Sequence, residues 1–359
     1  MAAQTARKRV TIRHLADSLG LTKGTVSRAL NGYPDIAEAT RLRVRRQADV
    51  LGYRPLSQAQ GIRTGRTRSI GLVIRTDLPY AQRPIIADFL AGVSRRASSD
   101  NWTLTVATAA SEAELIDTHS RLIDERKADG FILPRTDAND ARVTLLRETG
   151  TPFVLYGRTS DMTDCAWFDI SGEDAMTDAV DRLCRLGHRR IAFVNGDARY
   201  NFSRIRRDAV LAALADRGLP TDPGLMELTA MTHDTGRAAT ESLLGSDKPP
   251  TAILFATALA AVGAYSAAKA FGLKIGQDVS VISYDGIPEG EYADPGLTTY
   301  QVDNHHAGRR LAELLIRRVR GEPTETLREL APAKLAARGS DGPPALSSEQ
   351  LADRLKAAA

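Results

Sequence analysis

The sequence predicts a small all-helical head followed by a large α/β body of parallel, doubly wound sheets. Three observations lead to this fold class. Residues 11–51 place apolar side chains at helical spacing in three short stretches. From Ser69 onward, short apolar strands alternate with helices, which is typical of parallel sheets covered on both faces. The charge is also uneven: residues 1–66 hold 13 Lys/Arg and 4 Asp/Glu, a net of +9, so the rest of the chain carries −5.

The first two helices of the head form a predicted helix-turn-helix. Thr11 is placed to cap the first, and Gly20 ends it. Thr22 is placed to cap the second, which ends at Asn31-Gly32. Two short helices joined by a tight turn with glycine make this motif. The residues expected to face outward from the second helix are Lys23, Gly24, Ser27 and Arg28.

A third helix is predicted over Glu38–Leu51, with Gly52 as its end. It carries four arginines, of which Arg43 and Arg46 fit a solvated face as well as a phosphate contact. A basic head on a mildly acidic body is the charge pattern of a nucleic-acid-binding module. In such a motif, Lys23 and Arg28 can donate to guanine O6 and N7 in the major groove.

The predicted domains are a head over residues 1–55, a hinge over 56–68, a body over 69–336 and a tail over 337–359. The glycines and prolines near the start of the tail predict a mobile segment. The predicted strands of the body are SIGLVI, TLTVATA, GFILP, PFVLY, RIAFVNG, TAILFAT and VSVISYDG.

Several classes of protein are excluded by absent features. No run of roughly 18 apolar residues predicts a membrane span, and no apolar segment follows the basic N-terminus as in a secretory signal. The only cysteines, Cys165 and Cys184, suit a reducing cytoplasm. We expect no metal and no cofactor, because His305 and His306 lack other ligands at metal spacing, and we expect His188 to be structural. The motifs of phosphate-loop, zinc-protease and serine-hydrolase enzymes are missing, which predicts that the chain is not an enzyme.

The strings TIRHLADSLGLTKGTVSRALNG, LGYRP, RTGRT, LGHRRIAFVNG and YDGIPEGEYADPGLTT resemble the LacI/GalR family of bacterial repressors, up to about residue 330. The resemblance implies a two-lobed body like the periplasmic binding proteins. Its first lobe should run to about residue 160 and its second should start near Ser171, with later crossings near Tyr284–Asp285 and residue 300. It also implies a homodimer on a pseudo-palindromic operator DNA, controlled by a small-molecule effector that is usually a sugar.

By this resemblance, further residues of the head should lie near phosphates or groove walls. For Thr25 and Thr40, helix capping or packing is the alternative. In the hinge, Ile62 should act as a wedge in the minor groove, although Leu56 and Gly61 depart from the family pattern and the hinge could instead be a plain tether. The complete set of expected DNA contacts is Thr11, Arg13, Thr22, Lys23, Gly24, Thr25, Ser27, Arg28, Asn31, Thr40, Tyr53, Ala59 and Ile62, with Ala37 nearby.

The effector site should lie between the lobes, outside the carboxyl ends of the strands. By the resemblance, Arg206 is the strongest candidate, because an arginine fork can hold two hydroxyls or a carboxylate. The alternatives are a surface salt bridge for Arg206, core packing for Tyr200 and Phe202, and bracing of the lobe interface for Asp285. The expected effector-binding residues are Arg83, Ile86, Arg158, Tyr200, Phe202, Arg206, Met231 and Asp285.

Departures from the family narrow the expected effector. Ala258 stands where an aspartate is usual, and Ser171-Gly172 where Asp-Asn is common. The loss of two acidic acceptors favours a disaccharide over a monosaccharide held by carboxylates. The C-terminal signature also resembles repressors of alpha-glucoside utilisation. We therefore predict a sugar-responsive repressor; the alternatives are a regulator with a non-sugar effector and a sugar-binding transport protein, which would need an export signal and no helix-turn-helix.

Overall fold

The computed structural model describes residues 10–53, 66–77, 84–227 and 229–358. It divides the chain into two compact units, Met1–Arg68 and Ser69–Ala359. These units are called the head and the body.

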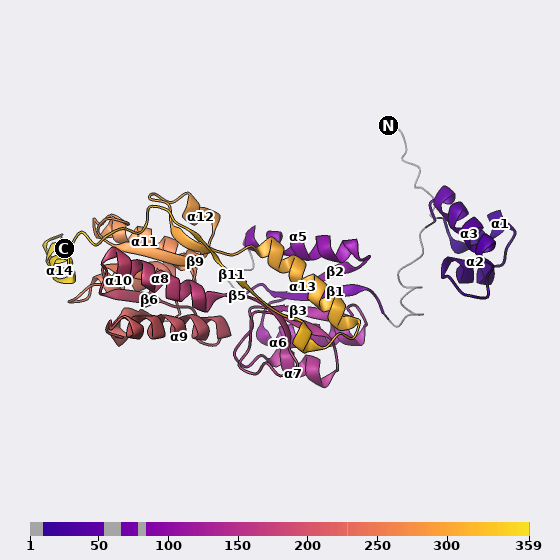
Figure 1. The fold of residues 1–359 in the computed structure, drawn as a ribbon, viewed down its shortest axis with the longest axis horizontal. Coiled ribbons are helices and arrows are strands. Elements are labelled where there is room, and N and C mark those ends of the chain that lie inside the picture. Colours follow the sequence, from indigo (N-terminus) through magenta and orange to yellow (C-terminus); the bar gives the residue numbers. More distant parts are fainter. Residues whose placement is uncertain (1–9, 54–65, 78–83, 228, 359) are drawn as a thin grey trace, which may run out of the picture. The chain divides into compact units, whose positions relative to one another are not determined.

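The head is a bundle of three short helices (Figure 1). They are α1 (Ile12–Leu19), α2 (Lys23–Leu30) and α3 (Glu38–Leu51). The hydroxyls of Thr11 and Thr22 cap α1 and α2 by accepting a backbone N–H three residues further on. Gly20 and Gly52 follow α1 and α3 in the left-handed conformation, which costs glycine little. The predicted helix-turn-helix and its caps are confirmed.

The core of the head comes from all three helices. Arg43 of α3 is part of this packing, because its guanidinium donates to the carbonyl oxygen of Leu19 at 2.6 Å. Arg43 therefore closes the end of α1, while Arg46 is exposed. The buried apolar residues are Leu15, Ala16, Leu19, Val26, Ala29, Val44 and Ala48.

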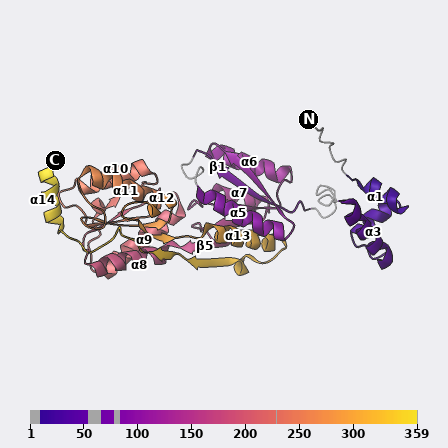
Figure 2. The ribbon, with the colours of Figure 1, turned by 90° about the horizontal axis from the view of Figure 1, so that it is seen from above.

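The first lobe of the body is a six-stranded sheet in the order β11-β5-β4-β3-β1-β2, in which all paired strands are parallel. Helices α5 and α13 pack together on one face, and α6 and α7 cover the other (Figures 1 and 2). The strands are β1 (Ser69–Arg75), β2 (Thr103–Ala109), β3 (Gly130–Pro134), β4 (Phe153–Tyr156), β5 (Ala166–Ser171) and β11 (Arg328–Pro332). The helices are α5 (Pro84–Ser99), α6 (Glu112–Asp124), α7 (Ala141–Glu148), α13 (Asn304–Val319) and the 3₁₀ turn η3 (Thr324–Thr326).

The second lobe is a six-stranded sheet in the order β12-β10-β9-β8-β6-β7. Its pairs are parallel except for β12, which runs antiparallel to β10. Helices α8 and α9 lie on one face, and α10 and α11 on the other. The strands are β6 (Ile191–Val194), β7 (Met226–Glu227), β8 (Ala252–Phe255), β9 (Ser280–Asp285), β10 (Thr298–Gln301) and β12 (Lys334–Ala336). The helices are α8 (Gly172–Leu186), α9 (Asn201–Asp216), η2 (Pro223–Leu225), α10 (His233–Leu244), α11 (Ala258–Ala270), α12 (Pro288–Glu291) and α14 (Ser348–Ala358).

The chain passes between the lobes after β5, after β10 and between β11 and β12. The predicted crossing near Tyr284–Asp285 is wrong, because β9 and β10 both lie in the second sheet, where Tyr284 pairs with Tyr300. The crossing near residue 300 is confirmed. The first lobe also extends to Ser171 rather than to residue 160, since β5 pairs with both β4 and β11.

Each lobe contains a helix pair whose backbones approach closely at glycine. A Cβ on Gly92 of α5 would lie 2.1 Å from the carbonyl oxygen of His305, at the crossing with α13. A Cβ on Gly263 of α11 would lie 2.1 Å from the carbonyl oxygen of His233, at the crossing with α10. Since any side chain would clash there, these glycines allow the two helices of each pair to pack closely against one another on the sheet.

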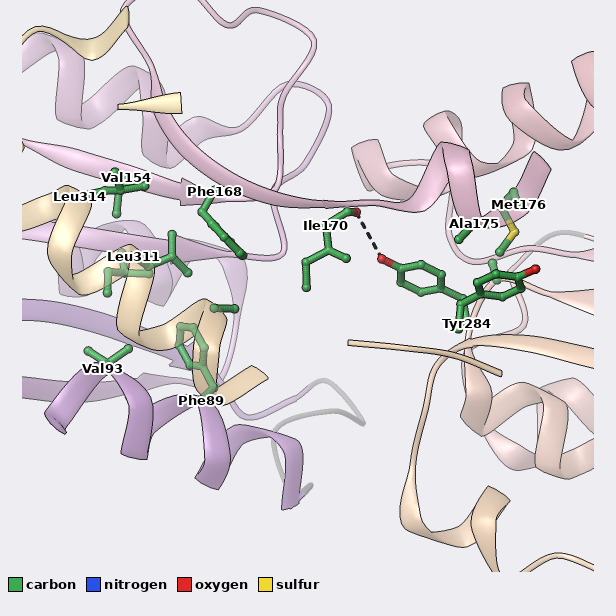
Figure 3. Packing of buried hydrophobic residues seen from close by; sticks show 14 of the residues in the cluster. Phe89, Val93, Val154, Phe168, Ile170, Ala175, Met176, Tyr284, Leu311 and Leu314 are labelled. Carbon is green, nitrogen blue, oxygen red and sulfur yellow. Dashed lines mark hydrogen bonds between the residues drawn. The ribbon is translucent and has the colours of Figure 1, made fainter. Parts of the chain in front are cut away.

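A buried tyrosine joins the two lobes near the crossings. Figure 3 shows Tyr284 of β9 pointing toward Ile170 of β5, and its hydroxyl donates to the Ile170 carbonyl oxygen at 3.2 Å. Phe89 and Phe168 belong to the same apolar cluster, which continues from the first lobe into the second. The lobes therefore share a packed hinge region beside the cleft described below.

Residues 337–358 pack against the second lobe, so the mobile tail predicted over 337–359 is wrong. Leu351 of α14 is fully buried in the core of that lobe. The fully buried carboxylate of Asp341 accepts a hydrogen bond from Arg182 Nε at 2.6 Å. Glycine and proline here allow sharp turns, and distant polar partners then hold the segment in place.

We predict that the body loses stability in mild acid through His119 on α6. Its Nδ1 lies 2.7 Å from the Leu115 carbonyl oxygen, and burial lowers the pKa of His119 to about 4. The unfolded chain, with a histidine pKa of about 6.5, binds the proton more readily between pH 6.5 and 4. Stability is therefore complete above pH 6.5 and falls by about 2–3 kcal/mol toward pH 4. Urea unfolding across this range will show a smaller fall for His119→Gln; an identical fall would contradict the assignment.

Candidate functional site

The outer face of α2 carries several of the residues predicted to contact DNA. Lys23, Gly24 and Arg28 are exposed, and Ser27 is partly exposed. Only the Thr22 hydroxyl, at 3.7 Å, lies within 4 Å of the place that a Cβ on Gly24 would take. The start of α2 is therefore open to close approach, as a helix that enters a major groove requires.

Arg28 already has partners within the head. Its guanidinium forms an ion pair with Asp35 and lies 5.5 Å from the centre of the Tyr33 ring. The Arg28 side chain is 52% exposed and that of Asp35 is 44% exposed. Exposed ion pairs contribute only about 0–1 kcal/mol, so a base edge can compete for this arginine.

Two of the predicted contact residues also hold the ends of α2. The hydroxyl of Thr22 accepts the Thr25 backbone N–H at 3.1 Å, and Asn31 Nδ2 donates to the Ser27 carbonyl oxygen at 2.6 Å. Of the other predicted DNA contacts in the head, Thr11 and Arg13 are exposed, Thr40 is partly buried, and Tyr53 packs against the core of the head. Ala59 and Ile62 of the predicted hinge, with Leu56 and Gly61, lie outside the described residues.

The body has a cleft lined by both lobes at the carboxyl ends of their strands, where ligands of open α/β sheets bind. Its volume is about 180 Å³, against about 30 Å³ for a neighbouring cavity. Because one water occupies about 30 Å³ in the liquid, the cleft has room for roughly six waters. Its apolar and aromatic walls come from Leu72, Ile74, Ile86, Phe89, Tyr156, Phe202 and Tyr284.

The guanidinium of Arg206 is buried in the wall of the cleft and held in a fixed orientation. The residue is 8% exposed, and its Nη1 donates to the Ala256 carbonyl oxygen at 2.7 Å. Its guanidinium carbon lies 3.8 Å from the centre of the Tyr284 ring and 4.7 Å from that of Phe202. Asp285 is 3.8 Å from Nη2. The guanidinium is therefore stacked, desolvated and pre-oriented, which suits bidentate recognition of a ligand.

A second arginine lines the cleft as part of an ion network. Arg158 donates from Nε to Asp169 at 2.7 Å and from Nη2 to both carboxylate oxygens of Glu173 at 2.8 Å. Burial raises the pKa of Asp169, although Arg158 opposes this. Arg158 and Arg206 each have a carboxylate partner, and a third arginine of the cleft, Arg135, lies 5.8 Å from the centre of the Phe202 ring.

Five of the predicted effector residues line the cleft: Ile86, Arg158, Phe202, Arg206 and Asp285. Arg83 lies outside the described residues. Tyr200 and Met231 do not line it, which corrects their predicted position. Tyr200 precedes α9 and stacks on the far side of Phe202, with ring centres 5.4 Å apart. Met231 packs beside Gly196 instead.

The cleft has acidic acceptors other than the two that Ala258 and Ser171-Gly172 replace. Ala258 is fully buried in α11 and does not line the cleft, whereas Thr257 before it does. The carboxylates come from Asp169 and Asp285. Asp169 was not predicted from the sequence, although a lone charge within the apolar run 166–171 was a usable signal.

The rim of the cleft is bridged by backbone pairing between the lobes. Asp137 and Tyr200 form an isolated antiparallel bridge. Ala138 donates its N–H to the Arg199 carbonyl oxygen at 2.8 Å, and Asn201 donates to that of Thr136 at 3.2 Å. This pairing explains why Tyr200 is turned away from the ligand space.

Two kinds of feature, a membrane-spanning helix and a metal-binding cluster, are absent among the described residues. No helix among them is long and apolar enough to cross a membrane. No group of three or more His, Cys, Asp or Glu side chains in these parts of the chain is arranged to hold a metal ion.

A helix-turn-helix head joined to a two-lobed body with a ligand-sized cleft defines a class: DNA-binding regulators that respond to small molecules. Family models agree with both parts. Residues 11–56 match the bacterial regulatory proteins of the lacI family, and residues 180–340 match the periplasmic binding protein-like domain.

Full-length relatives give the same result. The transcriptional regulator AglR of Rhizobium meliloti is 36% identical over 93% of this chain and 95% of its own length. RafR of Escherichia coli is 32% identical over 89% of this chain and 94% of its own. A solved complex of the transcriptional regulator CelR with cellobiose is 29% identical, with a TM-score of 0.72 over 92% of this chain and all of that one. The chain belongs to the LacI family of bacterial regulatory proteins, and it is a DNA-binding transcriptional regulator.

Proposed function

We propose that this regulator represses genes of sugar uptake or utilisation and that a neutral sugar bound in the cleft controls its affinity for operator DNA. One observation carries the effector class: a desolvated Arg206, stacked on Tyr284, in a cleft with aromatic walls. Aromatic faces pack on the apolar faces of sugar rings, and an arginine fork donates to adjacent hydroxyls. The cellobiose bound by CelR supports a sugar over other neutral ligands.

The size of the cleft bears on the effector. Room for roughly six waters is on the scale of one six-membered ring. In a disaccharide of the alpha-glucoside kind, which the C-terminal signature favours, one ring fills the enclosed space. The proposed contacts are Ile86, Arg158, Phe202, Arg206 and Asp285, joined by Asp169 and Thr257; Arg83 stays a prediction.

On the DNA side, we propose a homodimer that reads a pseudo-palindromic operator, since one head reads only a half-site. Lys23 and Arg28 read bases, and the remaining predicted residues of the head position it. We keep the domain limits 1–55, 56–68 and 69–336 as proposals, whereas the tail predicted over 337–359 contributes Leu351 to the core of the second lobe. A regulator of transcription acts where the DNA is, in the cytoplasm, and needs no catalytic group.

The proposal is tested by footprinting and gel shifts on the region upstream of the gene, with maltose and cellobiose as probes. We expect protection of an inverted repeat and a change in operator affinity with one of these sugars, alongside binding heats by calorimetry. Protection of a single asymmetric half-site contradicts the dimer. Operator binding that no neutral sugar alters contradicts the sugar effector and points to the non-sugar alternative.

A further inference from the structure

The first residue of α8 lies directly against the side chain of Arg206. A Cβ built on Gly172 would lie 2.9 Å from Arg206 Nε, 3.2 Å from its Cγ and 3.6 Å from its Cδ. The first of these distances is shorter than real Cβ contacts allow. The φ angle of Gly172 lies outside the left-handed region, so the backbone itself does not call for glycine. Glycine at this position is therefore a matter of space beside Arg206.

The side chain of Arg206 cannot move away from residue 172 without losing other contacts. Its Nη1 is bonded to the Ala256 carbonyl oxygen, and its guanidinium is held between the rings of Tyr284 and Phe202. Moving the side chain away from residue 172 would break the hydrogen bond or open the stack. In closely packed cores and buried polar networks, a shift of a few tenths of an ångström already disturbs the packing and the hydrogen bonds.

Arg206 Nε is buried and has no hydrogen-bond partner among the described residues. A buried N–H without an acceptor is costly, so such groups are normally satisfied by water or ligand. This N–H lies beside the space that Gly172 leaves open. A side chain at residue 172 would fill that space and displace the donor.

We propose that Gly172 is a positioning residue for effector recognition: its missing side chain lets Arg206 lie where the guanidinium serves the cleft. The ligand part of this inference rests on the proposed function. An asparagine, which the family resemblance places at this position, would force the arginine into another arrangement. The identity of residue 172 thus helps determine which sugar geometry the cleft accepts.

The test compares Gly172→Ala with Gly224→Ala, a control in η2 whose Cβ would meet only the Asp222 side chain, at 3.3 Å. First, without ligand, the arginine Nε–H signal that disappears in Arg206→Lys is followed by NMR. We expect that signal to move in Gly172→Ala and to stay in Gly224→Ala. An unmoved signal overturns the proposal.

Second, calorimetry with maltose and cellobiose measures affinity. We expect Gly172→Ala to bind the preferred sugar roughly tenfold or more weakly, the effect of one misaligned hydrogen bond from a charged group. In an Arg206→Lys background the same change should stay within about twofold. Equal losses in both backgrounds overturn the inference. If wild type binds neither sugar, the sugar assignment fails, while the NMR signal still decides the role of Gly172.

Folding is checked by operator binding and by the unfolding midpoint. If Gly172→Ala is poorly folded, the double variant with Arg206→Ala removes the obstructing side chain and should regain the midpoint of Arg206→Ala alone. A double variant that stays unfolded shows that Gly172 acts on something other than Arg206 and overturns the proposal.

Discussion

Replacing Arg28 by alanine is expected to weaken operator binding by a factor of roughly 10² to 10⁴ and to flatten base preference. Arg28 lies on the exposed face of α2, and its guanidinium can donate two hydrogen bonds to a guanine. Each such contact contributes about 1–3 kcal/mol, and a dimer on an inverted repeat loses two of them. Gel-shift titrations against operators altered one base pair at a time, at fixed salt, will measure both effects.

Three variants separate base readout from charge. Arg28→Lys keeps the charge but lacks the planar fork, so it should lose most of the selectivity. Asp35→Asn weakens the competing ion pair and should bind the operator at least as tightly as wild type. Arg46→Ala, on the exposed side of α3, should weaken binding to all sequences alike and reduce the salt slope by about 2, because each head of the dimer loses one phosphate contact. Operator binding by Arg28→Ala that is as tight and selective as in wild type would move the base readout to Lys23.

The head could be predicted closely from the sequence because its signals act over one helical turn. Thr11 and Thr22 cap helices through N–H groups three residues away, and Gly20 and Gly52 end them by their own conformation. The strands of the body could be predicted from short apolar runs, whereas its two lobes were expected from the family resemblance. Arg43 was the exception, since its partner is the end of a different helix.

The cleft was less predictable because long-range pairing decides which side chains reach it. Tyr200 has the right residue type, yet the backbone bridge to Asp137 turns it away. Asp169 reaches the cleft from β5, a strand that was not recognised as part of the first lobe. The tail was misjudged because the partner of Asp341 is Arg182, far away in the sequence.

Replacing Arg206 by alanine is expected to leave operator binding unchanged while abolishing the response to sugar. The guanidinium is buried in the second lobe, so the head keeps its DNA-contacting surface. Losing two charge-assisted hydrogen bonds of about 1.5 kcal/mol each predicts an affinity loss of roughly a hundredfold or more. A ligand changes DNA affinity only as far as it prefers one arrangement of the protein over another. A ligand that no longer binds therefore cannot exert the usual coupling of about 1–3 kcal/mol.

The measurement pairs calorimetry with gel shifts, using whichever probe sugar changes the operator affinity of wild type. Arg207→Ala is the matched control, because Arg207 neighbours Arg206 on α9 but pairs at the surface with Asp208. Arg207→Ala should keep both affinity and response. The unfolding midpoint of Arg206→Ala must be recorded as well, since the substitution also leaves the Ala256 carbonyl oxygen without this donor. If Arg206→Ala keeps full sugar affinity and full response, the effector binds elsewhere in the body, and Arg206 only braces Tyr284 and Asp285.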